Sequence, residues 1–224
     1  MNENRNAGFT LVEMLIAMMM SLIIITAVGR FMSVSSTTYQ AVDKQVNMQV
    51  EAQSVINAIS DMVLEANNVA YKEDTKNKYF FIYYDLGSTY SDGTEIKLVN
   101  HRTAKQKIIW FEKPASGKAG NLYLFDCKDH SGNVYDKATG THDGAQLFAE
   151  GVKDVSFSVA TATTSGSALT ADGLTSAVAS QSSPSVRIEV ELWSKVTSQS
   201  TKENGYTYTA SNVVAPRNEI VDIP

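Results

Sequence analysis

The stretch that decides the fold is Phe9-Thr10-Leu11-Val12-Glu13, followed by the 16 uncharged residues of Met14–Gly29, MLIAMMMSLIIITAVG. As a helix, the 16 uncharged residues cover about 24 Å, which is short of the roughly 30 Å hydrocarbon core of a bilayer. Counted from Phe9 the run has 21 residues, and a helix of that length reaches about 31 Å. The longer run includes Glu13, so a spanning helix places a carboxylate inside the membrane. A charge there costs roughly 2.5–3.5 kcal/mol and is a functional candidate by default.

Three interpretations of this stretch compete. A secretory signal peptide could be cut at Ala27-Val28-Gly29, but Glu3 and Glu13 offset the positive charge that its first region needs. A plain transmembrane anchor leaves Glu13 without a role. The third interpretation rests on Gly8 to Glu13. This stretch follows a short polar leader, precedes an apolar helix, and resembles the cleavage and methylation site of type IV prepilins and pseudopilins.

The resemblance implies roles for three residues in processing and assembly. A prepilin peptidase cuts between Gly8 and Phe9, removes residues 1–8 as a leader, and methylates the new amino terminus. Residues 9–30 then form a transmembrane helix that later enters the core of a filament. In the family, the glutamate at the place of Glu13 meets the terminal ammonium of a neighbouring subunit, here that of Phe9, and sets its register. Such an ion pair offsets the desolvation of a buried carboxylate.

The sequence differs from those of many major pilins in two features, and these differences indicate which kind of pilin it resembles. Many major pilins carry a helix-loosening proline where this sequence has Val28-Gly29-Arg30. Many also close a carboxyl-terminal loop with two cysteines, whereas Cys127 is the only cysteine here. Both departures favour a minor pilin, a minor pseudopilin or a pilin of another lineage. The run into Arg217-Asn218 resembles, more loosely, the minor pilins of the W and J classes.

Helical periodicity continues after Arg30, with apolar residues recurring at alternating spacings of four and three. The stripe consists of Met48, Ala52, Val55, Ile59, Met62, Ala66 and Val69. It predicts an amphipathic helix over residues 31–72 that packs on a head domain. The residues expected in that contact are Val55, Ile59, Met62 and Ala66, whereas Asp61 and Glu65 are expected to stay in water.

We expect one helix from about Thr10 to Ala70, because no proline interrupts the chain between Phe9 and Tyr71. The alternative is two helices separated near Ser33 to Thr38, since serine and threonine have poor helix propensity.

From Thr75 onward the apolar period changes to two, which is typical of strands. Strands are predicted at Tyr79–Tyr84, Glu95–Val99, Lys107–Phe111, Asn121–Phe125, Val152–Ala160, Val186–Trp193 and Thr207–Val214. Long loops are expected at residues 128–144 and 161–185. The predicted fold class is therefore α+β. It is a long amino-terminal helix, membrane-spanning and then amphipathic, packed on an antiparallel β-sheet head over residues 73–224. This is the lollipop architecture that the pilin resemblance implies.

The head offers little catalytic or cofactor chemistry. It has no Gly-x-Ser-x-Gly motif and no phosphate-binding glycine-rich loop, so we expect neither an enzyme nor a cofactor. Asp126, Asp129 and Asp136 suggest a calcium loop, but the spacing of a 12-residue calcium loop is absent. A solvated loop is the preferred interpretation, and no metal is expected.

A basic patch for nucleic acid is the other candidate in the head, formed by Lys97, Arg102, Lys105 and Lys107. With a neighbouring aromatic such as Trp110 it could bind DNA. The net charge of −5 disfavours such binding. A solvated hairpin turn is the preferred interpretation.

The expected function is that of a pilin-like, minor structural subunit. Its expected partners are a prepilin peptidase, other pilins or pseudopilins, an inner-membrane assembly platform and membrane lipid. We expect a single pass through the cytoplasmic membrane with the head outside, followed by a place in a pilus or pseudopilus. The alternatives are a minor pseudopilin of type II secretion or of competence DNA uptake, and an adhesive or DNA-binding tip module on a pilin stem.

Overall fold

The computed structural model describes residues 9–89, 91–96, 105–114, 119–127, 144–160, 167–168, 185–194, 205–218 and 220. The chain divides into two compact units, Met1–Lys44 and Gln45–Pro224. The first contains the apolar part of the helix. The second contains the rest of the helix and all the strands, and it is called the head below.

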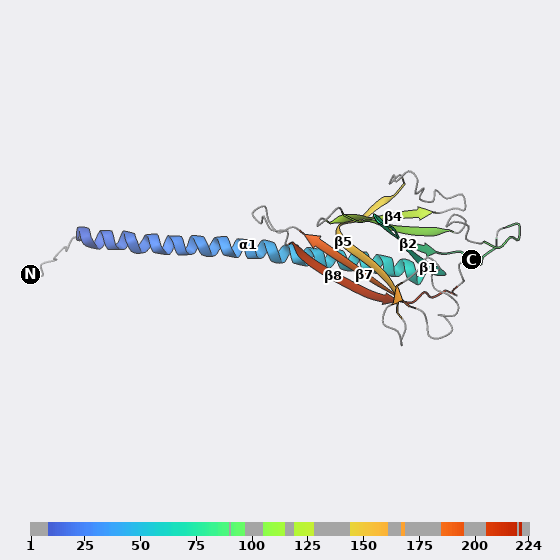
Figure 1. Cartoon of the computed structure of the whole chain (residues 1–224). Helices are drawn as coiled ribbons and strands as arrows, with labels where there is room; N and C mark the ends of the chain where they lie inside the picture. The colour runs from blue at the N-terminus through green and yellow to red at the C-terminus, as the bar shows by residue number, and fades with distance from the viewer. Residues whose placement is uncertain are drawn as a thin grey trace, which may run out of the picture. The chain divides into compact units, whose positions relative to one another are not determined.

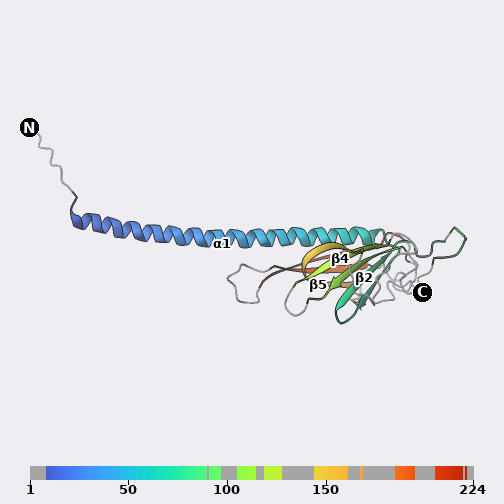
Figure 2. The same ribbon diagram turned by 90° about the horizontal axis from the view of Figure 1, so that it is seen from above.

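A single α-helix, α1, runs from Leu11 to Leu64 without a break, as Figure 2 shows. The serine- and threonine-rich stretch near residue 37 is helical, and its threonine hydroxyls bond back to the preceding turn. Thr37 Oγ1 donates to Val34 O at 2.9 Å, and Thr38 Oγ1 donates to the same carbonyl at 2.9 Å. The expectation of one helix is therefore met, and the alternative of two helices is not.

The helix ends earlier than the apolar spacing predicts, at Leu64 rather than near Ala70. Residues Asn68–Glu73 form a strand, β1, instead of the end of the predicted helical segment 31–72. Val69 and Ala70 are fully buried in that strand. Val69 and Ala70 fit the apolar spacing of a helix as well as the buried core of a strand, so periodicity could not locate the end of α1. Asn67 and Asn68 carry the local signal, because asparagine favours caps and turns.

The strands that the structure describes in the head form one antiparallel sheet, with the order β1-β2-β3-β4-β5-β7-β8. A two-residue strand, β6 (Ser167–Ala168), pairs with β5. The other strands are β2 (Asn77–Tyr83), β3 (Gln106–Glu112), β4 (Gly120–Cys127), β5 (Gln146–Ala160), β7 (Ser185–Ser194) and β8 (Tyr206–Val214). The α+β class is confirmed. Of the predicted strand Glu95–Val99, the described part shows only a bridge between Thr89 and Glu95.

The main core lies between the sheet and the carboxyl-terminal half of α1 (Figure 1). Ile56, Ile59 and Val63 from the helix are fully buried. Residues of β1 to β5, β7 and β8 join them in the same cluster. The strands β2 and β5 are not neighbours in the sheet order, yet the Phe80 and Phe157 rings stack with centroids 3.9 Å apart. The sheet therefore curls so that its two halves meet across the core.

A second core covers the opposite face of β2, β3 and β4, and it is mostly aromatic. Alternate residues of each strand enter the two cores, as Phe80 and Phe81 do in β2. The second cluster contains Ala70, Tyr79, Phe81, Tyr83, Leu86, Ile96, Ile108, Trp110 and Phe125. Burial on both faces explains why β2 is a nearly continuous apolar run, whereas β7 alternates between buried and wetter positions.

Candidate processing and assembly site

A capping box closes the amino-terminal end of α1. The Thr10 backbone N–H and the Thr10 Oγ1 hydroxyl each donate to Glu13 Oε2, both at 2.9 Å. In return the Glu13 backbone N–H donates to Thr10 Oγ1 at 3.2 Å. A threonine at the cap and a glutamate three residues later accept hydrogen bonds from backbone N–H groups of the first turn, which have no acceptor within the helix. The carboxylate also lies at the positive end of the helix dipole.

The Thr10–Glu13 contact gives the apolar segment a partner for its carboxylate inside the same chain. Both bonds end on Oε2. A carboxylate can accept through both of its oxygens, so Oε1 is available to a further donor. The capping role of Glu13 is one that the sequence analysis missed, although Thr-x-x-Glu before an apolar run is its sequence signature.

The apolar segment itself presents large side chains outward. Phe9 is 82% exposed and Leu11 is 81% exposed, and the whole segment Phe9–Arg30 lies on the surface of the chain. By length and composition, α1 is a helix that can cross a membrane. A continuous exposed surface of this kind needs lipid or other protein to cover it.

Two of the three hydroxyls in this segment, those of Ser21 and Thr26, are satisfied by the helix backbone. Ser21 Oγ donates to Ala17 O at 2.8 Å, and Thr26 Oγ1 donates to Ile23 O at 2.8 Å. Neither hydroxyl needs water, which suits a helix in hydrocarbon, where an unpaired polar group costs several kcal/mol.

The helix residues expected under the head are buried there. The exposed fractions are 5% for Val55, 0% for Ile59, 8% for Met62 and 0% for Ala66. Asp61 and Glu65 are exposed on the other side of the helix. This buried face packs the helix against the sheet.

The carboxyl-terminal end of α1 is capped by residues far along the chain. The Arg217 N–H donates to Leu64 O at 3.0 Å, and Asn218 Nδ2 donates to Glu65 O at 2.6 Å. The last carbonyls of a helix have no partner within the helix, so these two bonds replace the missing turn. This cap was not predicted from the sequence. Pro216-Arg217-Asn218 directly after a strand is its only local signal.

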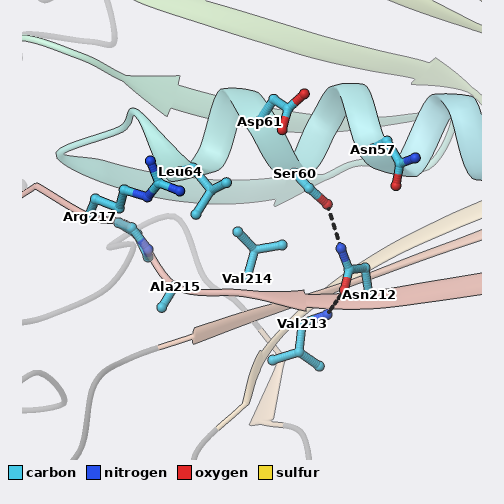
Figure 3. A pocket seen from close by; sticks show the side chains of 10 residues that line it. Asn57, Ser60, Asp61, Leu64, Asn212, Val213, Val214, Ala215 and Arg217 are labelled. Carbon is cyan, nitrogen blue, oxygen red and sulfur yellow. Dashed lines mark hydrogen bonds between the residues drawn. The ribbon is translucent and has the colours of Figure 1, made fainter.

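A groove of about 700 Å³ lies beside this cap, between α1 and the end of β8. Its helix side is formed by Asn57, Ser60, Asp61 and Leu64, and residues 212–217 form the other side. Figure 3 shows the amide of Asn212 reaching across to Ser60, where Nδ2 donates to Oγ at 2.9 Å. The groove has no catalytic pair of side chains, and its polar groups serve to join the strand to the helix.

The candidate metal and nucleic-acid residues in the head are only partly visible. Asp126 is exposed at the end of β4, whereas Asp129 and Asp136 lie outside the described residues. Within the described ranges, no group of three or more metal-ligating side chains comes together. Lys105 is exposed and Lys107 Nζ lies 5.6 Å from the centre of the Tyr84 ring.

Lys97, Arg102 and Gly8 also lie outside the described residues. Half of the predicted basic patch and the amino-terminal side of the predicted cleavage site therefore cannot be placed.

The family comparison supports the amino-terminal site. Residues 4–29 match the family model described as a prokaryotic N-terminal methylation motif. No curated protein and no solved structure matches the chain at a significant level. The match supports a prepilin-type segment and implies processing by a prepilin peptidase. Together with the long apolar helix, this match supports a type IV pilin-like or pseudopilin subunit in general, and a segment of this kind implies assembly with other pilins.

Proposed function

We propose that this protein is a minor pilin-type structural subunit, related to the W and J classes, that is cut between Gly8 and Phe9. Its helix anchors the precursor in the cytoplasmic membrane, with the head on the outer side, and then enters a filament with the help of an assembly platform. One observation carries this proposal. The methylation motif covers residues 4–29, and the described part of it is a capped helix whose apolar side chains are exposed.

The minor class is supported by the sequence rather than by the fold. Many major pilins carry a proline that kinks or melts the stem helix. Here α1 continues through Val28-Gly29-Arg30 without an interruption. The single Cys127 also leaves the head without an intrachain disulfide. Whether the machine is a pilus, a type II secretion pseudopilus or a competence pseudopilus is decided by the partners and not by these residues.

Processing is tested by mass spectrometry of the protein purified from its own cells. The expected mature chain begins with N-methylated Phe9. Replacing Gly8 by a bulky residue such as leucine should leave the eight-residue leader in place. Gly8→Ala, the mildest change, is the matched variant and should be cut at best poorly. A mature terminus at Arg30 would instead identify an ordinary signal peptide and refute the proposal.

A further inference from the structure

The edge strand β8 lacks the features that keep the other edge strand, β1, from pairing with a strand of another chain. Natural proteins protect edge strands with charges, prolines, bulges or short length. The β1 edge has six residues and carries Lys72 and Glu73. The β8 edge has nine residues, Tyr-Thr-Tyr-Thr-Ala-Ser-Asn-Val-Val, without a charge or a proline. Its pairing with β7 has no register shift, so no bulge turns the edge away.

The direction of the β8 backbone groups follows from one side-chain bond. The Val213 N–H donates to Asn212 Oδ1 at 2.9 Å and therefore not to β7. Successive residues of an antiparallel strand point their N–H and C=O groups alternately to its two sides. Thr207, Thr209 and Ser211 therefore also point away from β7, and all three are exposed. Among the described residues, no strand pairs with this side of β8.

Asn212 sets the end of this open stretch. Its Oδ1 accepts a hydrogen bond from the outward N–H of Val213, and its Nδ2 donates a hydrogen bond to Ser60 Oγ on α1. The open run of backbone donors and acceptors therefore stops at Ser211, where the groove beside α1 begins. An added strand has room for about five residues opposite Thr207 to Ser211, since paired strands advance by about 3.4 Å per residue.

The charges next to this edge select the partner. Ser211 lies opposite Glu189 on β7, and Thr209 lies opposite Glu191. Glu191 is paired with Lys153 at 2.7 Å, whereas no ion pair of Glu189 is found in the described part of the head. A strand added to β8 lies about 10 Å from β7, and a long basic side chain can cross the small Ser211 to reach Glu189. The chain's net charge of −5 opposes pairing with a second copy.

We propose that β8 is a docking edge for an extended segment of a partner protein that carries lysine or arginine on its solvent face. The segment extends the sheet by hydrogen bonds to Thr207, Thr209 and Ser211. A basic side chain opposite Ser211 pairs with Glu189. This contact is separate from assembly through α1 and does not depend on cleavage at Gly8.

The test uses the full chain in detergent micelles and a capped synthetic peptide of alternating threonine and lysine. Backbone amide exchange is followed by NMR. The amides of Thr207, Thr209 and Ser211 should exchange rapidly in the free protein, and at least tenfold more slowly with saturating peptide. A peptide with glutamate in place of lysine should bind at least tenfold more weakly, and so should the lysine peptide to Glu189→Gln.

A matched pair of variants at one position completes the test. Thr209→Pro removes an outward N–H that β7 does not use, so the head should fold and lose peptide binding. Thr209→Ala keeps that N–H and should bind as before. If Thr209→Pro does not fold, Thr209→Lys replaces it and should repel the basic peptide. The proposal is overturned by unchanged binding to the proline or lysine variant, or by equal binding of the glutamate peptide. Protection of these amides in the free protein that rises with its concentration indicates self-pairing and overturns it too.

Discussion

Truncating Ile59 to alanine should destabilise the head by a few kcal/mol. The Ile59 side chain is fully buried in the cluster that joins α1 to the sheet. Removing its outer carbons loses buried apolar surface and leaves a cavity, and such changes cost about 2–5 kcal/mol. Ile59→Val removes one carbon and should cost about 0.5–1.5 kcal/mol. A head with an ordinary stability of about 5–15 kcal/mol should survive both changes but unfold at lower denaturant concentrations.

The measurement is equilibrium urea unfolding of the full chain in detergent micelles, followed by tryptophan fluorescence. Trp110 is 2% exposed, so its emission reports on the packed head. The matched control is Asp61→Ala on the exposed face of the same helix turn, which should stay within about 0.5 kcal/mol of the wild type. The reasoning fails if Ile59→Ala is as stable as the wild type, or if Asp61→Ala is equally destabilised.

Three further predictions concern polar contacts. Glu13→Gln keeps an acceptor for the cap but loses the charge, and Glu13→Val loses both. If the charge acts in assembly, both variants should reach the membrane and be processed normally but be missing from sheared filaments; incorporation of either at wild-type level contradicts that role. Asn218→Ala should cost about 1 kcal/mol in urea unfolding, because the Glu65 carbonyl loses its donor; an unchanged midpoint would rule out a stabilising role for the Asn218 bond. Lys113 lowers the pKa of Glu73 by hydrogen bonding. The stability that the Lys113–Glu73 pair adds to the head is therefore present above the ordinary pKa of glutamate and is lost as the pH falls through the lowered pKa of Glu73. Lys113→Met should remove that part of the pH dependence below the ordinary pKa of a glutamate, and an identical pH profile would contradict it.

Much of the fold follows from patterns within the sequence. The buried stripe on α1 has a regular spacing, and Ile59 lies at its centre. The alternation of β7 also predicts its buried face, because one side of that strand packs on the helix and the other meets water. These patterns are visible because each element buries a single face.

Other features depend on contacts that no local pattern records. Val69 and Ala70 are apolar in a helix or in a strand, so the end of α1 could not be located by periodicity. The aromatic second core arises because β2 is covered on both faces. The cap at Leu64 comes from Arg217, whose role depends on where β8 ends. The amino-terminal site is the opposite case, since Thr10 and Glu13 are three residues apart and their signature is local.

The distant cap of α1 has a consequence for the order of events during synthesis. The Ser60–Asn212 and Glu65–Asn218 bonds join residues 152 and 153 positions apart. The ribosome makes the apolar helix first, so the membrane can receive it while most of the head is still unmade. The end of that helix remains uncapped until the chain has been translated past Asn218 and has left the ribosomal tunnel. Completion of the head can therefore follow membrane targeting, and during that interval the nascent strands have unpaired edges that are prone to aggregation.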